Sequence, residues 1–253
     1  MRPTRSLLLL TALLACSSQA HAAQGLSLRW DSCLIDGGVQ NKSFACDVNT
    51  GAEVLAGSFK LGADMGQVSG NEIVIDLASA GVALPAWWSF KNTGTCRQFA
   101  MTINFVTGAL EQDCPDWGAG AIVGGLGAYN IGLKGPNTAR IIAAAAVPPD
   151  QLQLLSAGQE YLSFNLVINH SKTVGTGSCA GCSTPVCLVL LAINITTPVL
   201  ANNRVIAGPM NGNDSDWATW QGGGGVVVGG NSGCPRALPT ERRSWGAVKA
   251  LYH

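Results

Sequence analysis

Three cysteines, Cys179, Cys182 and Cys187, lie within nine residues of one another and lead into the most hydrophobic segment of the mature chain. Their spacing, with Cys234 as a fourth thiolate, is roughly that of a zinc knuckle. The alternative is oxidation to disulfides, the usual state of cysteines in exported proteins. A haem-attachment motif is excluded, because Ser183 and not a histidine follows the second cysteine. We favour disulfides, because the N-terminus predicts export.

Residues 1–22 have the features of a secretory signal peptide. Two arginines precede a short apolar run, and Ala20-His21-Ala22 fits the small-x-small rule for signal peptidase. The apolar run is too short to span a bilayer. Residues 13–16 also resemble a bacterial lipobox, in which Cys16 would carry lipid and tether the protein to a membrane. The sequence therefore predicts a secreted or cell-surface protein, with lipid anchoring at Cys16 as the alternative.

Eight of the nine cysteines remain after removal of the signal peptide, and an even number in an exported chain predicts disulfides. They are Cys33, Cys46, Cys96, Cys114, Cys179, Cys182, Cys187 and Cys234. We expect Cys33 to pair with Cys46 around a short loop, and Cys96 to pair with Cys114 across a hairpin. The other four would form two further bridges, with Cys234 favoured as a partner for one cysteine of the cluster.

Residues suited to acid–base or nucleophilic catalysis are scarce. His21 belongs to the signal peptide and His253 is terminal, so the body has His170 alone, which continues the apolar face of its expected strand. A serine nucleophile needs a general base of this kind. Acidic residues cluster at 111–116 and 214–216 and could form the acid and base of a glycosidase, although acids in loops more often only contact solvent. The sequence thus favours a protein without enzymatic activity.

Four tryptophans are candidate ligand-binding residues: Trp87, Trp88, Trp217 and Trp220. Adjacent residues of a strand point to opposite faces, so one of Trp87 and Trp88 is expected to be exposed or covered by a loop. Exposed aromatic side chains can stack on sugar rings or pack against a protein partner. If these tryptophans are exposed, they would suit a protein that binds or processes carbohydrates.

The loop over residues 211–216 is the candidate metal site. Its side chains offer several oxygen ligands of the kind that calcium accepts, although their order is not that of an EF-hand. The candidate ligands are Asn211, Asn213, Asp214 and Asp216. No cofactor is expected otherwise, and calcium at this loop is the alternative.

Alternation of apolar and polar residues predicts the strands that would position these groups. The alternating segments lie within residues 26–31, 55–61, 72–77, 98–105 and 161–170. Phe99 is expected to share the inner face of its strand with Met101, and Leu162 is expected to share an inner face with Phe164. The alanine-rich segment 141–147 is assigned to a strand that is packed closely by small side chains.

The strand expected at 186–196, directly after the cysteine cluster, has no polar face and should therefore be covered on both sides. Eight or more short strands with turn signals between them predict an all-β fold. We expect an antiparallel β-sandwich of jelly-roll or immunoglobulin-like type, stapled by disulfides.

The charge distribution divides the chain into a body and a tail. Residues 23–235 form the expected β-sandwich domain and carry a net charge of −5, so they lack the basic balance of a nucleic-acid-binding domain. Residues 236–253 carry a net charge of +3 and include Trp245 and Tyr252. So short a segment does not hold a helix alone in water. We expect this basic, aromatic tail to dock on the sandwich as a clasp. The alternatives are that another protein binds it as an export or surface-attachment signal, or that it stays disordered.

Together these features favour an exported, non-catalytic β-sandwich protein that acts as a binding or structural module at the cell surface or outside the cell. The alternative is a carbohydrate-binding or carbohydrate-active protein that uses exposed tryptophans and loop carboxylates. The expected partner is a glycan or a cell-surface protein. No nucleic acid is expected, and membrane contact is expected only if Cys16 is lipidated.

Overall fold

The computed structural model describes residues 23–210, 215–223, 227–228 and 231–232. Within these ranges the chain forms β-strands and short 3-10 helices, and no helix there is long and apolar enough to cross a membrane. The expected signal peptide, most of the expected calcium loop and the basic tail lie outside the described residues.

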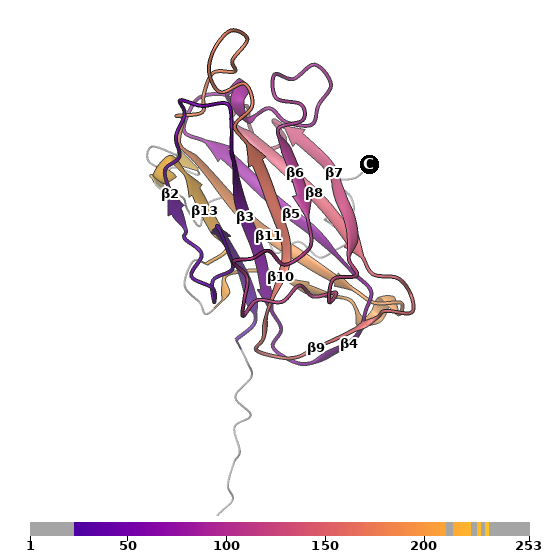
Figure 1. Cartoon of the computed structure of the whole chain (residues 1–253). Coiled ribbons are helices and arrows are strands. Elements are labelled where there is room, and N and C mark those ends of the chain that lie inside the picture. Colours follow the sequence, from indigo (N-terminus) through magenta and orange to yellow (C-terminus); the bar gives the residue numbers. More distant parts are fainter. Residues whose placement is uncertain (1–22, 211–214, 224–226, 229–230, 233–253) are drawn as a thin grey trace, which may run out of the picture.

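One layer of the fold is a sheet of four described strands in the order β1-β3-β10-β6 (Figure 1). Its members are β1 (Gly25–Trp30), β3 (Ala52–Lys60), β10 (Glu160–Asn169) and β6 (Met101–Asn104). All neighbours are antiparallel. The expectation that Phe99 faces inward is wrong, because the strand begins only at Met101 and Phe99 lies in the preceding turn with 79% of its surface exposed.

The other layer is a sheet of seven described strands, in which β2-β13-β11-β5-β8-β7 follow in order and β12 also pairs with β11. Its members are β2 (Asn41–Lys42), β13 (Trp217–Trp220), β11 (Val186–Thr196), β5 (Gly70–Ser79), β8 (Thr138–Ala146), β7 (Val123–Ile131) and β12 (Arg204–Ile206). Neighbours are antiparallel, except that β2 runs parallel to β13. The alanine-rich segment is therefore a strand, as predicted.

Two small ribbons complete the described strands. β4 (Met65–Val68) pairs with β9 (Gln153–Leu155) at one end of the sandwich (Figure 1), and β14 (Val227–Val228) pairs with β15 (Asn231–Ser232). The short 3-10 helices are η1 (Ala86–Trp88), η2 (Leu200–Asn202) and η4 (Gln221–Gly223).

The two sheets enclose one apolar core, to which both contribute alternate residues. From the four-stranded sheet come Leu55, Phe59, Phe164, Leu166 and Ile168, and from the seven-stranded sheet come Ile73, Ile75, Leu77, Leu188 and Leu190. Burial of these side chains removes a large apolar area from water, which is the main force that holds the layers together. The predicted antiparallel β-sandwich is confirmed.

Strand β11 lies in the middle of the seven-stranded sheet, between β5 on one side and β12 and β13 on the other. All of its residues are buried except Leu191 and Thr196, which are half-buried. The absence of a polar face in this segment therefore predicted its environment correctly: both of its faces are shielded from water.

Strand β10 contains a β-bulge between Leu162 and Phe164, where its register against β3 shifts. An inserted residue reverses the alternation of side chains beyond it. Phe164 accordingly points into the main core, whereas Leu162 packs with Cys33, Ala56 and Cys114 in a separate cluster. The prediction that Leu162 shares a face with Phe164 is wrong for this reason.

Candidate functional site

Three disulfides join six of the described cysteines: Cys33–Cys114, Cys46–Cys182 and Cys96–Cys179. Cys187 is also disulfide-bonded, and Cys234 lies outside the described residues. The predicted pairs Cys33–Cys46 and Cys96–Cys114 are wrong. The prediction that the other four cysteines pair among themselves is also wrong, because Cys182 pairs with Cys46 and Cys179 pairs with Cys96. Proximity in sequence misled the prediction, because the sandwich brings together loops that are 81 to 136 residues apart.

The oxidised state of these cysteines bears on both chemistry and location. A zinc knuckle needs thiolates, and Cys179, Cys182 and Cys187 are all engaged in disulfides. Structural disulfides persist in oxidising compartments and are rare in the cytosol. The bonds therefore indicate that the protein resides in a non-reducing environment.

Two of the disulfides tie together loops at one end of the sandwich. We call this surface the loop end, and it consists of residues 43–51, 80–100 and 170–185. Ala52 at the start of β3 pairs with Asn169 at the end of β10, and the end of β5 meets the start of β11, so these loops emerge together. Cys46–Cys182 links the first loop to the third, and Cys96–Cys179 links the second loop to the third. Two of the loops rise above the sheets in Figure 1.

Hydrogen bonds also hold these loops to one another. The Oδ1 atom of Asn49 accepts bonds from the backbone N–H groups of Thr173, at 2.7 Å, and Val174, at 2.9 Å. Lys172 Nζ donates to the carbonyl oxygen of Cys96 at 2.9 Å. All three loops of the loop end are thus joined by side-chain bonds as well as by sulfur, which gives them a fixed mutual position.

An aromatic cluster beneath the loop end contains three of the four candidate tryptophans. Trp87, Trp88 and Trp220 are buried, with ring centroids 4.9 to 5.4 Å apart. The indole N–H of Trp87 donates to Thr173 Oγ1 at 3.1 Å, and that of Trp220 donates to the carbonyl oxygen of Cys182 at 2.6 Å. These rings therefore support the third loop from below.

The burial of the tryptophans corrects the expectation that they present open rings to a ligand. Trp87 and Trp88 lie in η1 and not in a strand, so they do not point to opposite faces, and both enter the core. The sequence left two alternatives for one of these tryptophans, exposure to solvent or cover by a loop. Trp87 follows the second, because Thr173 of loop 170–185 accepts a hydrogen bond from its indole N–H. Of the four candidates, Trp217 in β13 is the one that is partly exposed.

Arg97 is a buried cation within the same cluster. Its guanidinium carbon lies 3.5 Å from the centroid of the Trp87 ring, and its N–H groups donate to the carbonyl oxygens of Trp87, at 3.0 Å, and of Asn169. Burial lowers the pKa of this guanidinium to about 9, because the charged form loses its hydration. The group remains a cation at neutral pH, and the ring face and carbonyls stabilise it.

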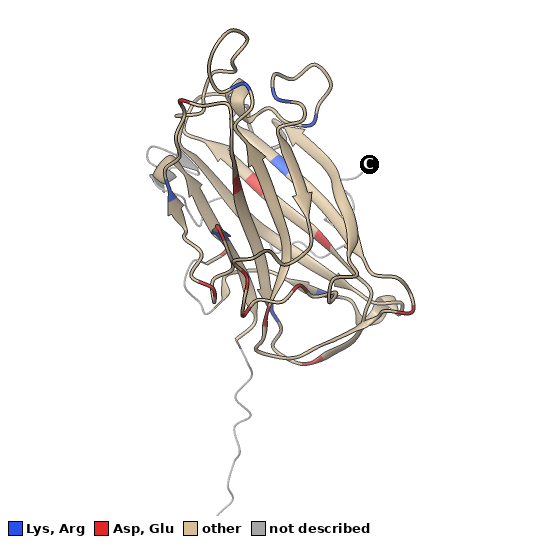
Figure 2. Cartoon of the chain, viewed as in Figure 1, with Lys and Arg blue, Asp and Glu red and all other residues tan. Residues whose placement is uncertain are grey.

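The outer part of the loop end presents apolar and basic side chains to solvent. Val82 has 92% of its surface exposed, Phe99 is exposed as described above, and Lys91 and Lys172 are also exposed. Figure 2 shows basic residues on the loops at this end, whereas many acidic residues lie in the connections at the opposite end. Sequence reasoning did not identify these four residues as a surface and placed Phe99 in the core, although they lie in the loops that carry Cys96 and the cysteine cluster.

Two of the acidic residues that could have served a hydrolase, Glu111 and Asp116, hold loops, and so does the buried Glu160. Glu160 is buried and accepts bonds from Ser58 Oγ, at 2.5 Å, and from the backbone N–H groups of Leu34 and Ile35, at 3.1 Å each. Glu111 Oε2 accepts a bond from the Gly108 N–H at 2.6 Å. Asp116 Oδ1 accepts bonds from the N–H groups of Gly118 and Gly120 in the same way.

His170, the one histidine among the candidates for general base, is buried and bonded to Glu53, with 3.0 Å between Nε2 and Oε1. The other side of that carboxylate faces Lys42 Nζ at 3.7 Å, and Lys42 in turn contacts Asp31 at 2.5 Å. The imidazole thus belongs to a chain of polar contacts that joins β3 and β2 to the residues directly after β1 and β10.

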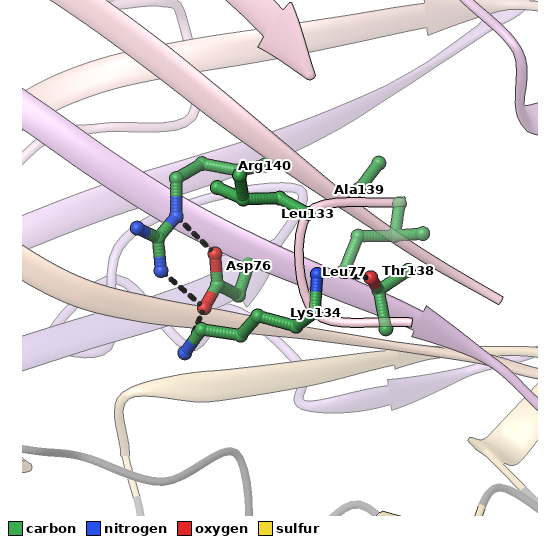
Figure 3. A pocket seen from close by; sticks show the side chains of 7 residues that line it. All are labelled: Asp76, Leu77, Leu133, Lys134, Thr138, Ala139 and Arg140. Atoms are coloured by element: carbon green, nitrogen blue, oxygen red, sulfur yellow. Dashed lines mark hydrogen bonds and ion pairs between the residues drawn. The ribbon is translucent and has the colours of Figure 1, made fainter. Parts of the chain in front are cut away.

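A shallow depression on the outer side of the seven-stranded sheet holds a second charge cluster (Figure 3). Arg140 binds Asp76 through two parallel contacts, Nε to Oδ1 at 2.6 Å and a terminal nitrogen to Oδ2 at 2.8 Å. Lys134 Nζ approaches the same Oδ2 at 2.9 Å. Both oxygens of the carboxylate are bound by cations of the same chain, so the cluster cross-links β5, β8 and the loop before β8.

Among the described residues, one group has the spacing of metal ligands: Cys33, Cys114 and Glu160. It does not fit a metal, because the two sulfurs are bonded to each other and the carboxylate already accepts three hydrogen bonds. Three of the candidate calcium ligands, Asn211, Asn213 and Asp214, lie outside the described residues. The fourth, Asp216, accepts a backbone bond from Leu190 through its carbonyl oxygen at 2.8 Å.

The class of protein that the fold and site define is a disulfide-cross-linked, all-β sandwich with a fixed set of loops at one end. No family model, curated protein or solved structure matches the chain. The loop end is the candidate functional site because it combines exposed apolar and basic side chains with a rigid support.

Proposed function

We propose that this protein is an exported, non-catalytic binding module that acts at the cell surface or outside the cell, and that the loop end is its binding surface. The observation that carries the proposal is the construction of this surface. Three loops far apart in sequence are joined by two disulfides and present Phe99 and Val82 to water. Loops held by a rigid scaffold are a common location of binding residues, and exposed apolar groups mark contact surfaces.

The chemistry of the surface favours a protein partner over a glycan. Phe99 and Val82 offer apolar contact area, and Lys91 and Lys172 add positive charge at the same end of the molecule. Such a surface complements a partner with an apolar centre and an acidic rim. Sugar binding would be served by open aromatic rings, and Trp87, Trp88 and Trp220 are covered.

A non-catalytic role agrees with how the reactive side chains are used. The buried carboxylates of Glu160 and Asp76 bind backbone N–H groups, a hydroxyl or cations of the same chain. His170 is held by Glu53. Each of these groups stabilises a local structure, and rigid fixation of loops serves binding, because the conformational entropy lost on association becomes smaller. The expected signal peptide and the disulfides agree with a location outside the cytosol.

The test is binding of the labelled protein, residues 23–253, to the envelope of the cells that produce it. We expect the double variant Val82→Ser, Phe99→Ser to bind at least tenfold more weakly, because the apolar centre of the contact is lost. The matched control is Leu154→Ser, which changes an equally exposed apolar residue, with 73% of its surface exposed, on β9 at the opposite end. The control should bind as the unchanged protein does.

Thermal unfolding of both variants shows that the fold is retained. Equal binding by the loop-end variant and the control would contradict the proposal. A glycan array that detects sugar binding lost on Trp217→Ala, with no effect of the loop-end variant, would replace it with the carbohydrate-binding alternative.

A further inference from the structure

On the outer side of the seven-stranded sheet, apolar residues flank the ion pair between Asp76 and Arg140. Ile73, Ile75 and Leu77 of β5 point into the core, so Val74 and Ala78 point to the outside. The registers place their counterparts on the neighbouring strands: Ile142 on β8 lies opposite Val74, and Cys187 on β11 lies opposite Ala78. Ala78, Cys187 and Val189 form an apolar cluster separate from the main core. We call five of these outward residues the outer face: Val74, Ala78, Ile142, Cys187 and Val189.

The outer face is buried, although it points away from the other sheet. Val74 has 4% of its surface exposed, Ile142 has 6%, and Cys187 has none. The polar neighbours Asn194 and Thr219 on the same side are almost fully buried too. Within the described part of the chain, the apolar side chains that pack against the cluster are Ala80, Leu191 and Trp217, which belong to this sheet or to the loop that leaves it. Burial to this degree requires a cover from another part of the chain.

The disulfide of Cys187 indicates which segment of the chain covers the outer face. Cys187 is disulfide-bonded, and the other six described cysteines are paired with one another. Its partner therefore lies in the remainder of the sequence, which contains Cys16 and Cys234. Cys16 belongs to the segment expected to be cleaved or lipidated. Cys234 is the remaining cysteine of the body, and it stands directly before the basic, aromatic tail.

The length and composition of the tail suit this role. Nineteen residues follow Cys234, and an extended chain of that length spans about 60 Å. Six strands set side by side about 4.8 Å apart are about 24 Å wide. The tail also carries large apolar side chains, Trp245, Val248 and Tyr252, which can cover an apolar face.

We propose that residues 233–253 form a strap that crosses the outer face and is anchored to it by a disulfide between Cys187 and Cys234. The strap closes the second side of β11, so the molecule has a third layer made by its own C-terminal segment. This inference is independent of the function proposed for the loop end, because the two surfaces lie on different strands and loops.

The first experiment maps disulfides in the intact oxidised protein, residues 23–253, by digestion without reduction and mass spectrometry. A peptide that links Cys187 to Cys234 is the expected result. A link from Cys187 to any other cysteine, in the same chain or in a second copy, would overturn the proposal. This measurement needs no variant and is therefore independent of whether a variant folds.

The second experiment measures exposure of the outer face by hydroxyl-radical footprinting. We expect the double variant Trp245→Ser, Tyr252→Ser to raise oxidation of Ile142 and Leu191 at least threefold, while oxidation of Phe99 at the loop end stays unchanged. The matched control is Arg242→Ser, Arg243→Ser, which alters the same segment without removing apolar area and should leave the face protected. Unchanged protection in the first variant would overturn the proposal. Protection through a new dimer, detected by sedimentation, would also overturn it and would identify a second copy as the occupant.

Discussion

At Gly57, strand β3 passes so close to the ring of Phe164 that a Cβ atom would lie 2.1 Å from it. Phe164 is fully buried in the core between the sheets, so its ring cannot swing into solvent. One missing side chain thus allows the Phe164 ring of β10 to lie against the backbone of the neighbouring strand. The alternating pattern of β3 gives no sign of this contact, because a glycine in a strand also fits a bulge.

The change Gly57→Ala is expected to lower the free energy of unfolding by about 1–3 kcal/mol, since an added methyl group forces the ring and backbone apart. Urea denaturation measures the change. The control is Gly125→Ala on β7, where a Cβ atom would meet nothing within 4 Å. That substitution should alter stability by less than about 0.5 kcal/mol. Equal effects of the two substitutions would contradict the packing described here.

The burial of Arg97 could not be predicted from the sequence. An arginine beside a cysteine in a polar loop reads as a surface residue, because arginine is rarely buried. Here the neighbouring disulfide and η1 draw it under the loops, where two carbonyl oxygens and the Trp87 ring take the place of water. The partners that permit this burial are 10 and 72 residues away, so no local pattern reports them.

At the scale of elements, periodicity predicted the strands and failed where the backbone departs from regular geometry. β5, β8 and β11 are where the alternating, alanine-rich and fully apolar segments placed them. The bulge in β10 and the turn before β6 reversed or ended the alternation, so Leu162 and Phe99 do not lie where a regular strand would put them. A bulge is stabilised by contacts with the partner strand, which a single segment does not contain.

The prediction of the disulfide pairs failed for a similar reason, because the order of the strands in the sheets decides which cysteines meet. Cys96 and Cys114 flank β6 and suggested a hairpin, but β6 is an edge strand beside β10, and the loop after β10 returns to Cys96. The loop end as a site was therefore not accessible from sequence: its parts come from three separate connections. The presence of cysteines in each connection was the available signal, and it did not specify the partners.

Removal of the Cys96–Cys179 bond by the double change Cys96→Ser, Cys179→Ser is expected to loosen the loop end. Loss of a native disulfide typically lowers stability by about 2–5 kcal/mol. Limited proteolysis should cleave loop 170–185 at least several-fold faster, because Cys179 is its fixed point on loop 80–100. The control, Cys33→Ser with Cys114→Ser, removes a bond far from this loop and should lower stability without accelerating that cleavage. Equal cleavage in the two variants would show that the loop is held by its hydrogen bonds instead.

For the whole molecule, the disulfides contribute a stabilisation that is comparable with the net stability of a typical domain. A domain is typically stable by about 5–15 kcal/mol, the small remainder of large opposing terms. The three disulfides between described cysteines, at about 2–5 kcal/mol each, amount to a comparable total. The sandwich therefore depends on the redox state of its surroundings, and this connects its architecture to the non-reducing environment in which it resides.

Reduction of the intact protein, residues 23–253, is accordingly expected to unfold it at 37 °C. The reduced and alkylated chain should lose the near-ultraviolet circular dichroism of its packed tryptophans, because Trp30, Trp87, Trp88 and Trp220 contact one another only in the folded core. Protein treated with the alkylating agent alone keeps its disulfides and should keep its spectrum. If the reduced chain retained the spectrum and a cooperative thermal transition, the apolar core would be sufficient by itself. The link between the disulfides and the place where the protein works would then lose its energetic basis.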